Sequence, residues 1–253
     1  ALRNSFNIAA VNMSLGGGQY ASNCDAIDTG RKAAIDSLRS AGIATVIAAG
    51  NSGYTNSAAI PSCISSAISV AASDGNDRVA SFSNLAPYTT LIAPGIDVYA
   101  AVPGGGFDDK SGTSMAAPHV AGVIALLKQA RPSLTVPQII SALTSSGPLI
   151  SDQRPGGAIS KRRLHAYEAL CRVITCDADD FRVLQYGQTI SGAIGTAGDV
   201  DHFYFLGQPG DRLTLQASRT SGTLDPYIEL LDRTGARVAL NDNGGGGVNA
   251  LIN

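Results

Sequence analysis

The stretch Ser111–Gly122, SGTSMAAPHVAG, carries most of what this sequence reveals. A glycine-flanked loop leads here into an apolar helix that we expect over Thr113–Ala130, with Pro118 inside its first turn. Amide groups at a helix N-terminus lack intrahelical partners and favour negative charge, so Ser114 is a candidate nucleophile beside an oxyanion site. The simpler alternative is that Ser114 only caps the helix, because serine is a preferred N-cap residue.

Short apolar runs alternate with helical patterns around this stretch. Buried strands are expected at Ile8–Leu15, Ala44–Ala49, Ala67–Ala72 and Thr90–Ala93, and further helices at about Asp25–Ser40 and Val136–Thr144. Ile27, Ala34, Ile35 and Leu38 would form the apolar face of the first of these helices, which Gly42 would end. Apolar strands that alternate with helices predict an α/β fold, with a parallel sheet covered by helices on both faces.

The pattern changes near residue 172, where the apolar period drops to two. The runs DHFYFL, RLTLQA, YIELLD and RVALND are separated by turn pairs such as Pro209-Gly210. Short strands with regular turns predict a small antiparallel β-sandwich. We therefore expect two domains, residues 1–172 and 177–253.

Composition excludes several classes of partner. The net charge is −2, and charged residues are 15% of the chain and spread singly, so neither nucleic acid nor an anionic membrane is expected as a partner. The longest apolar run falls far short of the ~20 residues of a membrane span. Because the chain begins just before a buried strand and ends where another strand pattern starts, we interpret it as a fragment of a longer protein.

Four cysteines occur, at positions 24, 63, 171 and 176, and none forms C-x-x-C. No histidine has zinc-finger spacing, so a metal site is not expected. We favour disulfides Cys24–Cys63 and Cys171–Cys176, because each pair then lies within one segment. Four free buried thiols remain the alternative.

The segment GTSMAAPHVAG resembles the nucleophile motif of the subtilase family of serine proteases, G-T-S-x-A-x-P-H-x-x-G, and matches it at every fixed position. Ala48–Gly53, AAGNSG, resembles the oxyanion-hole segment of that family. Asn12–Gly17, NMSLGG, resembles the strand beside the S1 pocket. The resemblance covers about residues 1–170 and implies a secreted subtilisin-like serine endopeptidase that acts on proteins or peptides.

The resemblance also implies roles for single residues. Ser114 would be the nucleophile, and Asn51 and the Ser114 amide would donate to the oxyanion with support from Thr113. Ser14, Leu15 and Gly16 would pair with substrate backbone, and Ala48, Gly50 and Ala59 would complete the substrate site. A small uncharged Ala59 near the pocket floor predicts an apolar P1 residue. Without the resemblance, Asn51 would be read as a turn residue, and the SLGG segment as the end of a strand.

The other members of a triad are missing. In the subtilase order the aspartate and histidine precede the serine, whereas His119, His165 and His202 all follow Ser114. His119 lies on the Ser114 helix and should point away from the serine, and His165 is expected at the surface or at a domain contact. The chain alone is therefore expected to be inactive and to need an upstream segment of its own protein that bears the triad histidine and aspartate.

Two other interpretations compete with this one. The first is a non-catalytic adhesion or binding protein built on a degenerate protease fold. The second is an α/β-hydrolase, in which Asp152 and His165 would serve Ser114. Gly112-Thr113-Ser114-Met115-Ala116 does not match the G-x-S-x-G elbow of that fold, and Asp152 and His165 are too close in sequence to suit it.

The sequence identifies no cofactor with certainty, and structural calcium is an alternative for the full-length protein. Calcium prefers several oxygen ligands, including carboxylates. Thr90 occupies a position where the family uses an acid, and Asp108 with Asp109, or Asp199 with Asp201, could bind a cation. Solvated loop acids are the simpler interpretation.

Residues 177–253 resemble a truncated bacterial pre-peptidase C-terminal (PPC) domain. The resemblance is carried by Gly192–Ile194, Gly198–Phe205, Gly210-Asp211, Leu224–Tyr227 and Asn241-Asp242. Its aromatic residues Phe203, Tyr204, Phe205 and Tyr227 are expected in its core.

Overall fold

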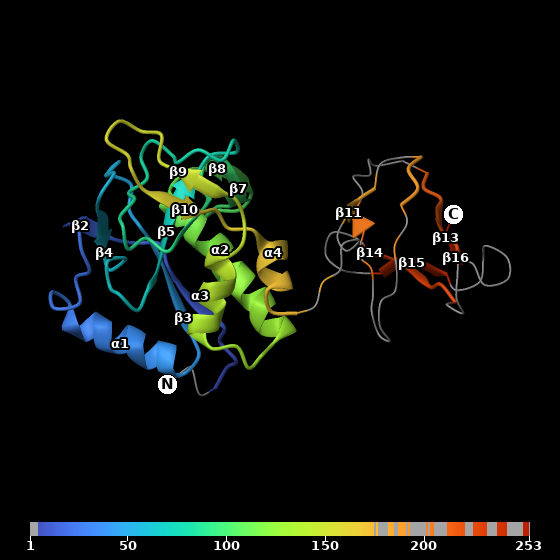
Figure 1. The fold of residues 1–253 in the computed structure, drawn as a ribbon, viewed down its shortest axis with the longest axis horizontal. Helices are drawn as coiled ribbons and strands as arrows, with labels where there is room; N and C mark the ends of the chain where they lie inside the picture. The colour runs from blue at the N-terminus through green and yellow to red at the C-terminus, as the bar shows by residue number, and fades with distance from the viewer. Residues whose placement is uncertain are drawn as a thin grey trace. The chain divides into compact units, whose positions relative to one another are not determined.

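The computed structural model describes residues 5–174, 176, 182–184, 187–190, 192, 201, 203–204, 212–220, 225–231, 237–241 and 250–252. The chain divides into two compact units, Ala1–Ala178 and Asp179–Asn253 (Figure 1). His202, Asp199 and Phe205 lie outside the described residues.

A four-stranded parallel sheet forms the centre of the first unit. Its order is β1 (Ala10–Met13), β3 (Ala44–Ala48), β5 (Ile68–Ser73) and β6 (Leu91–Pro94). All four strands overlap the predicted ones, and the parallel arrangement is confirmed. Since the strands run the same way, the loops that follow their carboxyl ends lie along one edge of the sheet.

The two faces of the sheet are covered by different helices, as predicted. Val46 of β3 packs with Ile124 of α2 (Thr113–Ala130) in the largest apolar cluster. Ile47 points to the opposite face and packs in a second cluster with Ile35 of α1 (Thr29–Ser40). This alternation follows from the two-residue period of a strand.

The first helix is shorter than predicted, and its apolar face is narrower. It begins at Thr29 rather than near residue 25, because the side chain of Asp28 accepts a hydrogen bond from the Arg31 amide and caps it. Ile27 precedes the helix and is 62% exposed, and Ala34 is also exposed, so both expectations of burial were wrong. Gly42, at φ +76°, follows the helix as predicted.

Two later helices flank the C-terminal part of the first unit. α3 (Val136–Thr144) has the predicted bounds and starts with a capping box between Thr135 and Gln138. α4 (Ala166–Cys171) was not predicted, because six residues are too few for a helical period to be recognised. His165, expected at the surface or at a domain contact, is the N-cap of α4 and accepts from the Glu168 amide at 3.2 Å.

Three two-stranded antiparallel pairs complete the first unit. They are β2 (Gly17–Tyr20) with β4 (Ala58–Ile60), β7 (Val98–Ala101) with β8 (Phe107–Lys110), and β9 (Leu149–Ser151) with β10 (Ser160–Arg162). None was predicted, because strands of three or four residues carry too short a pattern.

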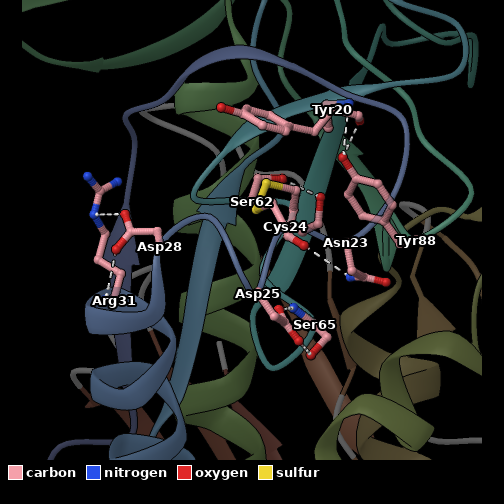
Figure 2. The surroundings of a disulfide bond; sticks show 12 residues. Tyr20, Asn23, Cys24, Asp25, Asp28, Arg31, Ser62, Ser65 and Tyr88 are labelled. Carbon is pink, nitrogen blue, oxygen red and sulfur yellow. Dashed lines mark hydrogen bonds and ion pairs between the residues drawn. A yellow bond between two sulfur atoms is a disulfide. The ribbon is translucent and has the colours of Figure 1, made fainter.

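The segments that follow β2 and β4 are linked by the disulfide Cys24–Cys63 (Figure 2). The Tyr88 hydroxyl donates to the carbonyl of Tyr20 at 2.7 Å and accepts from the Ala58 amide at 3.1 Å, which ties β2 to β4. A second disulfide joins Cys171 and Cys176, so the favoured pairing is the one that the structure contains.

In the second unit, each of the four runs with a two-residue period contains a strand. The strands pair as β11 (Arg182–Val183) with β12 (Phe203–Tyr204), β13 (Leu215–Ala217) with β16 (Ala250–Ile252), and β14 (Ile228–Leu231) with β15 (Arg237–Asn241). The β-sandwich stays a prediction. Tyr227 is 53% exposed and Phe203 is 36% exposed, so the expectation that these two rings are core residues was wrong.

Candidate active site

The helix that carries Ser114 starts with a glycine. Gly112 is the N-cap of α2 and offers no side-chain cap, while Ser114 is the second residue of the helix and is half-buried. The alternative that Ser114 serves as the N-cap was therefore wrong. Its neighbour His119 is exposed, and its Nδ1 is 2.8 Å from the carbonyl oxygen of Met115 one turn earlier.

Pro118 is the sixth residue of α2. The prediction that it lies within the first turn was therefore wrong. Proline has no amide hydrogen, so the carbonyl of Ser114, four residues earlier, loses its helical partner. The Ser14 hydroxyl donates to this carbonyl at 2.8 Å, and Asn12 Nδ2 donates to Ser14 Oγ at 3.0 Å. The segment after β1 is thus bonded directly to the backbone of Ser114.

Asn51 follows β3 and is held by the start of α2. Its Oδ1 accepts from the Thr113 amide at 2.9 Å and from Thr113 Oγ1 at 2.8 Å. Thr113 Oγ1 in turn accepts from the Gly50 amide at 3.1 Å. Because Thr113 donates both bonds to Oδ1, the two N–H groups of the Asn51 amide stay oriented away from Thr113.

The absence of a side chain at Gly112 leaves room beside this amide. A Cβ on Gly112 would stand 3.5 Å from Asn51 Nδ2 and 3.6 Å from the Ser114 amide nitrogen. Asn51 Nδ2 and the Ser114 amide nitrogen therefore both lie beside Gly112.

Two glycines and an alanine meet next to Asn51. Ala59 Cβ lies 3.1 Å from where a Cβ on Gly16 would stand, and equally far from one on Gly50. Ala59 is 2% exposed, whereas Leu15 beside Gly16 is 54% exposed. Ala48 is not brought into this group, because it belongs to the apolar cluster beneath α2.

Asn84, which was not among the predicted site residues, holds the Asn51 loop. Asn84 Oδ1 accepts from the amides of Ser52 at 2.9 Å and Tyr54 at 3.1 Å, and its Nδ2 donates to the Ala49 carbonyl at 3.0 Å. Gly50, at φ +102°, packs so tightly against Asn84 Nδ2 that a Cβ would collide with it. A buried asparagine in ASFSN was the available signal, but its partners are about 30 residues away in sequence.

The α/β-hydrolase arrangement is not formed. Asp152 is paired with Arg154 through a contact of 2.7 Å between carboxylate and guanidinium. His165 caps α4 and accepts from the Glu168 amide. Neither side chain is therefore available as the partner of Ser114.

Two of the positions considered for calcium, Thr90 and Asp108, have protein partners. Thr90 Oγ1 accepts from the Ser69 amide at 3.1 Å, and Asp108 is ion-paired with Lys110. Hydrogen bonding to Lys110 lowers the pKa of Asp108 below its ordinary value. Across the described ranges, no three His, Cys, Asp or Glu residues are grouped so as to bind a metal ion.

The parallel sheet, its covering helices and the start of α2 define a subtilisin-like α/β domain. The model of the subtilase family, peptidase family S8, matches residues 3–163, and the chain belongs to this family.

Its relatives include alkaline serine exoprotease A of Vibrio alginolyticus, 33% identical over 94% of this chain and 43% of the relative. Subtilisin DY of Bacillus licheniformis is 38% identical over 56% of this chain and 50% of its own length. Among solved structures, a protease of Pseudoalteromonas arctica superimposes with a TM-score of 0.57 at 31% identity, over 66% of this chain and 51% of that one. The chain thus spans half or less of the length of these curated relatives.

Among the described helices, none combines the length and the apolar character needed to cross a membrane.

Proposed function

We propose that this chain is the nucleophile-bearing part of a subtilisin-like serine endopeptidase. The observation that supports this most directly is that Asn51 Nδ2 and the Ser114 amide nitrogen both lie beside Gly112, at the start of α2. Ser114 would attack the scissile carbonyl, and the carbonyl oxygen would accept from Asn51 Nδ2 and from the Ser114 amide as its negative charge develops. Thr113 would hold the Asn51 side chain in place through its two hydrogen bonds to Oδ1.

The substrate would bind alongside the segment that follows β1. Ser14–Gly16 would add the substrate backbone as a strand, and Gly16 and Gly50 would flank the P1 side chain above Ala59. No acid lies in this group of three residues, so we expect an apolar P1 residue. Peptide anilides with leucine or phenylalanine at P1 should be cleaved faster than those with arginine, and a strict arginine preference would contradict this proposal.

The triad histidine and aspartate would come from an upstream segment of the same protein. Two features support a covering segment of this kind. β1 is an edge strand of the sheet. In addition, α2 exposes a face made of Pro118, His119, Gly122, Ala125 and Leu126, and Leu126 is 52% exposed. Without a base a serine hydroxyl is a weak nucleophile, so the chain alone should be inactive or nearly so.

Secretion and a PPC-like role of residues 177–253 belong to the same proposal. Two disulfides support an oxidising compartment.

The test is active-site labelling of the protein that includes the upstream segment. A fluorophosphonate probe should label Ser114, and the label should be lost in Ser114→Ala and in the present chain alone. An unlabelled but folded protein that still binds peptides would favour the non-catalytic alternative instead.

A further inference from the structure

Asp152 and Arg154 form a largely buried ion pair in the first unit. The Asp152 side chain is fully buried, and its carboxylate accepts from Arg154 Nε at 2.8 Å and from Nη2 at 2.7 Å. Such a two-point contact fixes the plane of the guanidinium as well as its position. The turn at Gly157 packs closely against this pair. A Cβ on Gly157 would stand only 2.6 Å from the Asp152 carboxyl carbon, so no larger residue fits there.

The remaining nitrogen of this guanidinium binds backbone. Nη1 of Arg154 donates to the carbonyl oxygens of Ala80 and Ser81, at 3.4 Å each, and to that of Ser83. These three carbonyl oxygens surround one nitrogen at a partly buried place, and a positive partner there offsets their mutual repulsion. Arg154 supplies that charge from within the chain, and Asp152 balances it.

This segment is the one that holds the Asn51 loop. The backbone amide of Asn84 donates to the Gly50 carbonyl at 2.9 Å. The side-chain Oδ1 of Asn84 accepts from the backbone amides of Ser52 and Tyr54. The Gly53 amide donates to the Phe82 carbonyl at 2.7 Å. Every backbone group of the Asn51 loop named here is thus bonded to residues next to the carbonyls that Arg154 binds.

We propose that Arg154, held by Asp152, is a positioning residue for the oxyanion donor Asn51. This inference rests on the proposed function. Arg154 touches neither Ser114 nor Asn51; it fixes residues 80–84, which fix residues 49–54. Loss of the guanidinium would let the Asn51 amide move relative to the Ser114 amide, and a displacement of about 1 Å or less weakens a donor to a developing oxyanion.

The experiment compares Arg154→Gln with Arg163→Gln in the protein that includes the upstream segment. Arg163 also forms an ion pair in the first unit, with Asp77 at 2.5 Å, but no hydrogen bond joins its side chain to residues 80–84 among the described contacts. We expect Arg154→Gln to lower kcat about tenfold with little change in KM, since a complete loss of one donor lowers kcat by about 10²–10³. Arg163→Gln should leave both constants near their original values.

Two further measurements separate positioning from a general loss of stability. A peptide boronic acid, which forms a tetrahedral adduct with the serine, should bind Arg154→Gln about tenfold more weakly, while a product peptide binds unchanged. Amide hydrogen exchange at Ser52 and Tyr54 should be faster in Arg154→Gln than in Arg163→Gln. If Arg154→Gln does not fold, Asp152→Asn is measured by the same criteria, because it retains the side-chain volume and removes the balancing charge.

The outcomes are distinguishable from those of the proposed function. Equal kcat, boronate affinity and exchange rates in the two arginine variants would overturn the role of Arg154. An original protein that neither hydrolyses peptides nor reacts with a fluorophosphonate would overturn the proposed function, and the exchange measurement would still decide whether Arg154 holds the loop.

Discussion

Two neighbouring regions of the first unit are stabilised by different forces. Beneath α2, apolar side chains such as Val46, Ile124 and Leu127 are completely buried against one another. At the carboxyl edge of the same sheet, the loop around Asn51 is held by directional hydrogen bonds. Asn84 Oδ1 accepts from the Ser52 amide, and the Thr113 amide donates to Asn51 Oδ1. Apolar packing tolerates similar shapes, whereas hydrogen bonds fix atoms to a few tenths of an ångström.

The difference has a functional reason. A catalytic donor must be held at a fixed place relative to the nucleophile, and directional bonds do this better than packing does. The core must instead supply the free energy that keeps the whole unit folded, which comes mainly from buried apolar area. Substitutions in the core should therefore change stability, and those at the loop should change rate. The kinetic predictions below refer to the protein that includes the upstream segment.

The largest effect is expected in the core. Ile124→Ala should lower the free energy of unfolding by about 2–5 kcal/mol, because a fully buried isoleucine leaves a cavity. Thermal and denaturant unfolding measure this change, and kcat of the folded fraction should be unchanged. A variant of unchanged stability but lower kcat would contradict the comparison.

The second effect is a decrease in kcat, and it is expected at the Asn51 loop. Converted to free energy, it is similar in size to the stability change in the core. Asn51→Ala should lower kcat by about 10²–10³, the range already established for such a donor in subtilisin, a member of this family. The unfolding midpoint should shift little, since Asn51 is exposed. Steady-state kinetics on a peptide anilide measure the loss, and a rise in KM alone would argue against an oxyanion role.

Tyr88→Phe should have an intermediate effect on stability. It removes two hydrogen bonds between β2 and β4 and should cost about 1–3 kcal/mol, because the Ala58 amide and the Tyr20 carbonyl lose their partner. Burial raises the pKa of Tyr88 above its usual value near 10. The folded state then retains this proton to higher pH than the unfolded state, so the contribution of Tyr88 to stability declines as the pH rises above 10.

Denaturant unfolding at a series of pH values tests this direction. The original protein should lose more stability than Tyr88→Phe between neutral pH and pH values above 10. A parallel decline in the two proteins would show that Tyr88 does not titrate differently on folding.

The smallest effect is expected at Ser14, which bonds the segment after β1 to the Ser114 carbonyl at the start of α2. Ser14→Ala removes the hydroxyl that replaces the missing helical donor at Pro118, and the cost should be about 0.5–1.5 kcal/mol for one hydrogen bond. A decrease of a few-fold in kcat should accompany it, because the Ser114 carbonyl would be less firmly held. Ser141→Ala on the solvent side of α3 is the matched control. Equal kinetics of the two variants would show that the bond has no part in positioning Ser114.

Long elements with a clear period were predictable from sequence. α2 and α3 have the predicted bounds, because eighteen and nine residues of regular apolar spacing leave little ambiguity. Short pairs such as β2 with β4 were missed, since their stability depends on partners that are distant in sequence. Ile27 misled the prediction of α1, because an apolar residue can precede a capped helix and stay exposed.

The sequence by itself determined the family, the central α/β arrangement and the identity of Ser114 and Asn51 as the residues to consider, because these are properties of local pattern and motif. Only the tertiary structure decided that Ser14 replaces the donor that Pro118 lacks, that Ala48 lies in the core, and that Arg154 binds three carbonyls behind the Asn51 loop. Hydrogen bonds between segments up to 100 residues apart leave no periodic signal in a single chain, and they exist only once the sheet has brought those segments together.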